Sequence, residues 1–162
     1  MKKAKMFLAA LGLCTLLYSP AFAQTTGKRI DLYFGDWHAS PSRRVHGALE
    51  ERDILTRGDA MNPAQKGAVL RFINSYAYAT LAPHASTRAE PLQGQQEIYF
   101  VQSGEGVARA GGQSVDLCRN MAILVPAELN FSIENTGDRP MTMYVIDEPT
   151  PPGFRPNSSI LA

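Results

Sequence analysis

The feature that most limits the fold of this chain is a succession of short apolar segments separated by turn residues. From residue 67 onward these segments are rich in β-branched and aromatic residues, and no helical period links them. They cover residues 68–74, 76–81, 97–102, 107–110, 113–117, 121–125, 129–134 and 141–146. Strands of this length at this spacing are typical of an all-β sandwich or barrel. Hairpins are expected at Gly111-Gly112 and at Thr136-Gly137-Asp138, because these residues tolerate positive φ.

The first 23 residues do not belong to this pattern. Residues 2–5 contain three lysines, an apolar run over 6–18 follows, and 21–23 is an Ala-Phe-Ala sequence of the kind that signal peptidase cleaves. This layout predicts a secretory signal peptide over residues 1–23. The apolar run is shorter than the roughly 20 residues that a transmembrane helix requires. We therefore expect a secreted or periplasmic protein that begins near Gln24 and has no membrane contact after cleavage.

The charge balance excludes a broad class of partner. The chain has 16 Lys and Arg residues against 15 Asp and Glu residues, and removal of the basic signal peptide leaves a slight acidic excess. Nucleic-acid-binding proteins generally need a basic face, so we expect no nucleic-acid partner. Because 44% of the residues are hydrophobic, the chain can form a buried core and is not expected to be disordered.

The regions that flank the strand-rich segment show no sustained period. We interpret residues 24–66 as an N-terminal arm with one or two short strands that lies over a barrel of residues 67–148, and the proline-rich residues 149–162 as an extended tail. We expect a homodimer in which the β-rich piece 30–34 adds an edge strand to the sheet of its own or of the partner subunit, because open sheet edges require cover. A solvated face is expected for the basic residues Arg43, Arg44 and His46.

Two segments of the strand-rich region resemble the motifs of the cupin superfamily. Glu97 and Gly104, with six residues between them, resemble the end of the first cupin motif. Pro126 and Asn135 have the spacing that the second motif gives to its proline and asparagine. The resemblance covers about residues 78–148. It implies an all-β, cupin-like double-stranded β-helix, which is a jelly-roll barrel, with the N-terminal arm outside it.

The metal-binding positions of the family are largely lost in this chain. Cupin metal sites typically use three histidines and one glutamate, and the resemblance retains only the glutamate, Glu97. The histidine positions are held by Pro91 and Gln93 (or by Glu90 and Leu92 if the gap has one extra residue) and by Phe131. Because a lone carboxylate is a poor divalent-metal site, we expect no metal and no other cofactor.

One route to a metal stays open, through the three histidines that precede the motifs. The arm can in principle carry His38 or His46 across the mouth of the barrel. The alternative cofactor is therefore a divalent transition metal, held by Glu97 with His84 and Glu90 as the next candidates. The simpler interpretation is that these histidines are surface or capping residues.

The interior of the barrel is the candidate ligand site. Strand alternation places Glu97, Tyr99 and Val101 on one face, and the resemblance implies that this face points inward. The residues expected to bind a ligand are Gln93, Gln95, Glu97, Tyr99, Leu129 and Phe131. Polar groups among apolar walls describe a small-molecule pocket, although they equally describe a filled core in which a glutamine satisfies Glu97. If Glu97 is buried with no cation beside it, burial raises its pKa, and Glu97 with Tyr99 becomes the candidate catalytic pair.

Two classes of function follow. The first is an exported, metal-free, single-domain cupin that binds a small organic ligand or a partner in the barrel. The alternative is a cupin enzyme, of the dioxygenase, isomerase or lyase type, with a rearranged metal site. The missing histidines favour the first class. The sequence also has no Gly-x-Ser-x-Gly elbow and no phosphate-binding loop.

Overall fold

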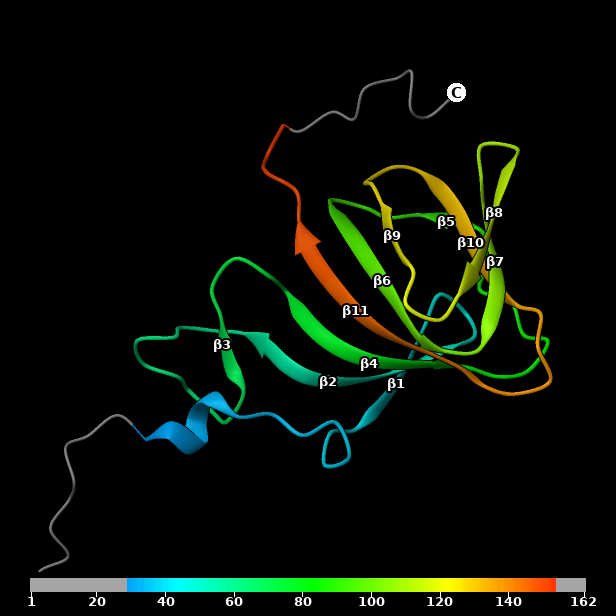
Figure 1. The fold of residues 1–162 in the computed structure, drawn as a ribbon. Coiled ribbons are helices and arrows are strands. Elements are labelled where there is room, and N and C mark those ends of the chain that lie inside the picture. Colours follow the sequence, from blue (N-terminus) through cyan, green and yellow to red (C-terminus); the bar gives the residue numbers. More distant parts are fainter. Residues whose placement is uncertain (1–28, 154–162) are drawn as a thin grey trace, which may run out of the picture.

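Residues 29–153, which the computed structural model of the chain describes, form two β-sheets that face each other (Figure 1). The predicted signal peptide and the tail beyond residue 153 lie outside the described residues. The described part includes a single 3-10 turn, η1 (Ile30–Tyr33), and no helix in it is long and apolar enough to cross a membrane. The prediction of an all-β jelly-roll barrel is therefore confirmed.

The larger sheet has seven strands in the order β1-β2-β4-β11-β6-β9, with β3 beside β2. Its strands are β1 (Ser42–Val45), β2 (Leu49–Arg57), β3 (Ala68–Leu70), β4 (Ser75–Leu81), β6 (Gln95–Ser103), β9 (Ala122–Val125) and β11 (Met141–Pro149). Every neighbouring pair is antiparallel except β2 with β3. Because β11 pairs with both β4 and β6, the last strand of the described residues lies inside this sheet and not at its edge.

The smaller sheet has four strands in the order β5-β10-β7-β8. Its strands are β5 (Glu90–Pro91), β7 (Glu105–Ala110), β8 (Gln113–Cys118) and β10 (Asn130–Asn135). The hairpin predicted at Gly111-Gly112 joins β7 to β8, and both glycines have positive φ.

The second predicted hairpin is wrong, because residues 136–138 carry the chain from β10 in the smaller sheet to β11 in the larger one. The crossing is held by the buried side chain of Asn135. Its amide nitrogen donates to the carbonyls of Leu81, Ala82 and Arg139, and its oxygen accepts from the backbone N–H of Gly137. The side chain of Asn135, and not a two-strand turn, therefore sets the geometry here.

Aliphatic and methionine side chains fill the space between the two sheets. The largest fully buried ones include Leu49, Leu81, Leu117, Ile133, Met141 and Met143. Burial of each such side chain contributes roughly 1.5–3 kcal/mol to the free energy of folding. Glu97, Tyr99 and Val101 also point inward, at 4%, 0% and 0% exposure, as strand alternation predicted.

The expected division into an arm and a barrel at residue 67 needs correction. Strands β1 and β2 lie inside the range assigned to the arm, yet β2 pairs with β4 along the larger sheet and Leu49 is fully buried. The segment expected as an edge strand, residues 30–34, instead forms η1 and lies beside β3. A true arm is limited to the segment before β1, where Trp37 stacks on Tyr78 of β4.

Candidate functional site

A cavity of about 280 Å³ opens on the inner face of the larger sheet. Strands β1, β2, β6 and β11, together with the start of β4, contribute its walls. Its lining residues are Arg43, Val45, His46, Glu51, Asp53, Thr56, Asn74, Ser75, Gln95, Glu97, Val145 and Asp147. The cavity is therefore lined mainly by charged and polar side chains, in contrast to the apolar walls expected from the sequence.

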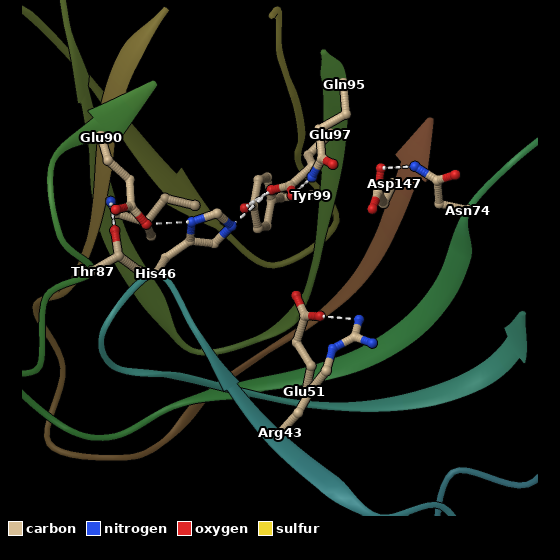
Figure 2. Close-up of polar contacts among 11 residues, drawn as sticks. Arg43, His46, Glu51, Asn74, Thr87, Glu90, Gln95, Glu97, Tyr99 and Asp147 are labelled. Atoms are coloured by element: carbon tan, nitrogen blue, oxygen red, sulfur yellow. Dashed lines mark hydrogen bonds and ion pairs between the residues drawn. The ribbon is translucent and has the colours of Figure 1, made fainter. Parts of the chain in front are cut away.

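Glu97 lies at the centre of this region, and both of its carboxylate oxygens accept hydrogen bonds (Figure 2). Gln95 donates to Oε1 at 2.9 Å, and the Tyr99 hydroxyl donates to Oε2. His46 Nε2 lies 3.2 Å from the same Oε2. The alternative in which a glutamine satisfies Glu97 is therefore correct for Gln95, but a histidine takes part as well.

His46 belongs to the turn between β1 and β2. Its backbone has a φ of 46°, a left-handed conformation that few residues other than glycine adopt without cost. The backbone N–H of Arg88 donates to its carbonyl at 2.7 Å and ties the turn to the segment before β5. Figure 2 shows the imidazole between two carboxylates, with Nδ1 3.1 Å from Glu90 Oε1 on the side away from Glu97.

The paired carboxylates keep His46 protonated. Burial lowers the pKa of the imidazole, but the hydrogen bond and charge of Glu97, with a further hydrogen bond to Glu90, raise it from 6.5 to about 9. For Glu97, burial alone would raise the pKa. The hydrogen bonds from His46 and Tyr99 and the charge of His46 outweigh burial, so the pKa of Glu97 is lowered. The expectation of a raised pKa for Glu97 applied only if no cation lay beside it, and that condition does not hold, because His46 contacts its carboxylate.

A second cluster of charged side chains is centred on Arg43 of β1. Its guanidinium contacts Glu51 at 2.6 Å and Asp53 at 3.0 Å, both on β2. The side chain of Glu51 is 5% exposed, and burial raises its pKa although Arg43 partly offsets this. The expected solvated face therefore holds for Arg44 and for Arg43, whose side chain is 43% exposed, but is wrong for His46.

Asp147 of β11 faces the same cavity. It is the register partner of Glu97 on β6, so the two carboxylates lie on neighbouring strands of the same sheet. Asn74 donates to its Oδ1 at 2.9 Å. Burial and the negative charge of Glu97 raise the pKa of Asp147, although the hydrogen bond from Asn74 opposes them.

The other predicted site residues are divided between the centre and the surface. Phe131 is 3% exposed, and its ring packs against those of His46 and Tyr99 with centroids 5.6 and 5.9 Å away. Leu129 is half-buried and lines, with Phe131, a separate apolar hollow of about 110 Å³. Gln93, expected among the ligand-binding residues, is exposed and does not line the cavity.

The residues around Glu97 do not fit the metal that the family implies. His84, expected among the alternative ligands, is exposed and pairs with Asp138, and His38 is exposed and pairs with Asp36. The remaining histidine has both ring nitrogens directed at carboxylates. Within residues 29–153 no group of three or more His, Cys, Asp and Glu side chains is placed to hold a metal ion.

Sequence reasoning missed the contribution of β1 and β2. Their inward positions include Glu51 and Asp53, so the apolar alternation that reveals other strands is absent here. A usable signal was the His46-Gly47 pair, since a glycine after a polar residue between two strand-length segments is typical of a turn.

The two facing sheets, with the carboxylate of Glu97 between them, define the class of small jelly-roll barrels. A family model for the cupin domain matches residues 77–147. This match identifies residues 77–147 as a cupin domain, and the solved structures below share its fold. The matched segment contains Glu97 and Phe131 but neither β1 nor β2, so His46 and Arg43 lie outside it.

Several solved structures share the fold at low sequence identity. A predicted oxalate decarboxylase from Thermotoga maritima has a TM-score of 0.58 and 21% identity, covering 71% of this chain and 97% of its own. KdgF from Halomonas sp. has a TM-score of 0.54 and 10% identity, with coverages of 78% and 96%. A cupin 2 conserved barrel domain protein from Salinispora arenicola has a TM-score of 0.53 and 14% identity, with coverages of 67% and 81%. A comparison with curated proteins found no match. At these identities the likeness establishes the fold and not an activity.

Proposed function

We propose that this chain is an exported cupin that binds a small polar organic ligand in its charged cavity and needs no metal to do so. The observation that carries the proposal is the cavity of about 280 Å³ between Arg43, Glu51, Asp53, Glu97 and Asp147. Charged groups are costly to remove from water, and a stable core would be built from apolar side chains instead. Their retention around a hollow therefore supports a binding role.

The lining favours a ligand that donates hydrogen bonds. Four carboxylates, those of Glu51, Asp53, Glu97 and Asp147, face two cationic side chains, those of Arg43 and His46. This excess of acceptors suits an amine or a polyhydroxyl compound and disfavours a simple carboxylic acid. The size suits a small compound, because drug-sized ligands occupy pockets of roughly 300–1,000 Å³.

The alternative of a cupin enzyme has less support at this site. With a lowered pKa, Glu97 is ionised at neutral pH and is unsuited to be a general acid. Its two oxygens already accept hydrogen bonds from Gln95 and Tyr99. A metal held in stoichiometric amount would restore the enzyme alternative, since a cupin activity with a rearranged metal site would then have its cofactor.

Ligand screening of chelator-treated protein tests the binding proposal. We expect backbone ¹H–¹⁵N signals of β6 and β11 to shift with a diamine or a polyol and not with a small monocarboxylic acid. Asp147→Asn should weaken this response about tenfold or more, because it removes one carboxylate. Arg109→Gln, at a surface pair with Glu134 on the smaller sheet, is the matched control. No response from any amine or polyol, or an equal response in Asp147→Asn, would contradict the proposal.

Export rests on the basic head, the apolar run and the Ala-Phe-Ala site of residues 1–23. Mass spectrometry of material recovered from the periplasm or the medium should find a chain that begins near Gln24. Recovery there of a chain that still carries Met1 would count against the signal peptide.

The homodimer stays a prediction, although the route through an edge strand at residues 30–34 is excluded by η1. The outer face of the larger sheet is aromatic, with Tyr76 stacked on Tyr144 and Phe100 39% exposed. Sedimentation equilibrium at micromolar concentration gives the test, and a monomeric mass contradicts it.

A further inference from the structure

We propose that His46 is a built-in counter-ion of Glu97, a cation of the chain itself at the carboxylate to which the cupin family gives a metal ion. The inference rests on the metal-free centre proposed above and adds the residue that replaces the metal. It also assigns a role to the β1–β2 hairpin, which lies outside the segment that matches the cupin domain.

The first argument is the hydrogen bonding of the imidazole. Nε2 faces Glu97 at 3.2 Å and Nδ1 faces Glu90 at 3.1 Å. An ionised carboxylate only accepts hydrogen bonds, so both contacts are satisfied when both ring nitrogens carry a proton. The doubly protonated ring has a positive charge. The geometry therefore fits an imidazolium and leaves neither nitrogen free to ligate a metal.

The second argument is burial. The side chains of His46 and Glu97 are 13% and 5% exposed. A buried carboxylate without a cation is strongly disfavoured, so a barrel that has lost its metal ligands needs another positive charge beside Glu97. His46 provides it from the β1–β2 turn, whereas Arg43 is directed at Glu51 and Asp53.

The third argument is the way in which the ring is held. Phe131, at the family's second-motif histidine position, packs against the imidazole in an edge arrangement instead of ligating. The carbonyl of His46 is fixed by Arg88, and the backbone at His46 adopts a left-handed conformation. Four segments thus place the ring: the β1–β2 turn, the strand that bears Glu97, the strand that bears Glu90, and β10.

A double-mutant cycle between His46→Ala and Glu97→Gln, measured by urea unfolding of the exported protein, tests the pairing. Each substitution alone should raise the unfolding constant. The double variant should fall short of the product of the two effects by about tenfold or more, because a neutral amide in place of the carboxylate no longer needs the cation. The cycle of His84→Ala with Glu97→Gln is the control and should be multiplicative, since His84 pairs with Asp138 at the surface. A multiplicative result for His46 as well would overturn the inference.

Two measurements on the parent protein keep the test decisive if a variant does not fold. ¹⁵N NMR of the histidine rings at pH 7 should show both nitrogens of His46 protonated, and an unprotonated nitrogen would overturn the inference. Equilibrium dialysis against Zn²⁺ or Mn²⁺ alone should give less than stoichiometric binding. If the parent protein binds metal stoichiometrically and both Glu97→Gln and His46→Ala abolish this binding, the two residues are metal ligands and the inference is overturned. If the cycle shows coupling but no amine or polyol binds, the counter-ion stands and the proposed ligand is wrong.

Discussion

The two ends of the inner face of the larger sheet have opposite chemistry, although the same strands build both. At one end, Leu81 of β4, Val101 of β6 and Met143 of β11 are fully buried and apolar. At the other end, β6 and β11 carry Glu97 and Asp147 as register partners. Glu51 and Asp53 of β2 line the same cavity, although they pair with Ala79 and Ala77 of β4, nearer the apolar end. Like charges directly opposite each other destabilise a sheet. One end therefore stabilises the barrel, whereas the other places two carboxylates opposite each other, which does not.

Phe131 of β10 packs from the smaller sheet against the rings of His46 and Tyr99, and its removal should have the largest effect. Phe131→Ala should lower the free energy of unfolding by about 3–5 kcal/mol, because it leaves a void between the rings of His46 and Tyr99. Urea unfolding measures this. Phe72→Ala, at a ring that is 75% exposed, is the control and should cost less than about 1 kcal/mol. Equal stabilities of the two variants would show that the charged end does not depend on this wall.

The charged end should make stability depend on pH above neutrality. Glu97 of β6, Glu90 of β5 and Glu51 of β2 face His46 and raise its folded-state pKa from 6.5 to about 9. A raised pKa means that the stabilisation is complete below about pH 6.5 and is lost as the pH rises through about 9. The free energy of unfolding should fall by about 3 kcal/mol at most over this pH range.

Unfolding curves between pH 6 and 10 check this dependence. His46→Ala should flatten the profile over this range. Leu81→Ala, at the apolar end, should lower stability at every pH by a similar amount and keep the slope of the parent. A parent profile without a slope would show that His46 is not charged in the folded protein.

Two neighbouring arginines on β1 give a sharper test, because Arg43 pairs with a buried carboxylate and Arg44 with an exposed one. Arg43→Gln leaves Glu51, which is 5% exposed, without its cation and should cost about 1–3 kcal/mol. Arg44→Gln breaks an exposed pair with Glu50 and should cost less than about 0.5 kcal/mol. Thermal melts at low and high salt compare them. An equal and salt-sensitive loss of stability in both variants would mean that the burial of Glu51 does not strengthen its pair with Arg43.

The smallest expected effect is a gain in stability from the substitution Asp147→Asn. The pKa of Asp147 is raised by burial and by Glu97, so its ionised form is less stable in the folded protein than in the unfolded chain. Asp147→Asn should increase stability by up to about 1 kcal/mol at pH 7, because it removes a like-charge pair while the introduced amide oxygen still accepts from Asn74. The gain should vanish at pH 3, where the carboxyl is protonated. A loss of stability at pH 7 would show that the ionised carboxylate is needed for folding.

Local sequence determined most strands from residue 75 onward and the side to which their residues point. Alternation within β6 is a property of consecutive residues, so the inward direction of Glu97, Tyr99 and Val101 followed from the sequence and from the resemblance. The hairpin at Gly111-Gly112 also followed, because its turn chemistry is local. The loss of the metal-ligand histidines is likewise a fact of the sequence.

Only the tertiary structure decided what lies beside Glu97. His46 is 51 residues earlier in the chain, in a segment whose strands are hidden because their inward residues are charged. No period in the sequence reports such a contact, since it depends on β2 pairing with β4 and on Arg88 fixing the turn. That distant cation reverses the direction of the pKa shift of Glu97. Strand periodicity is set by neighbours along the chain, whereas the electrostatics of a buried carboxylate are set by whatever the fold brings within a few ångströms of it.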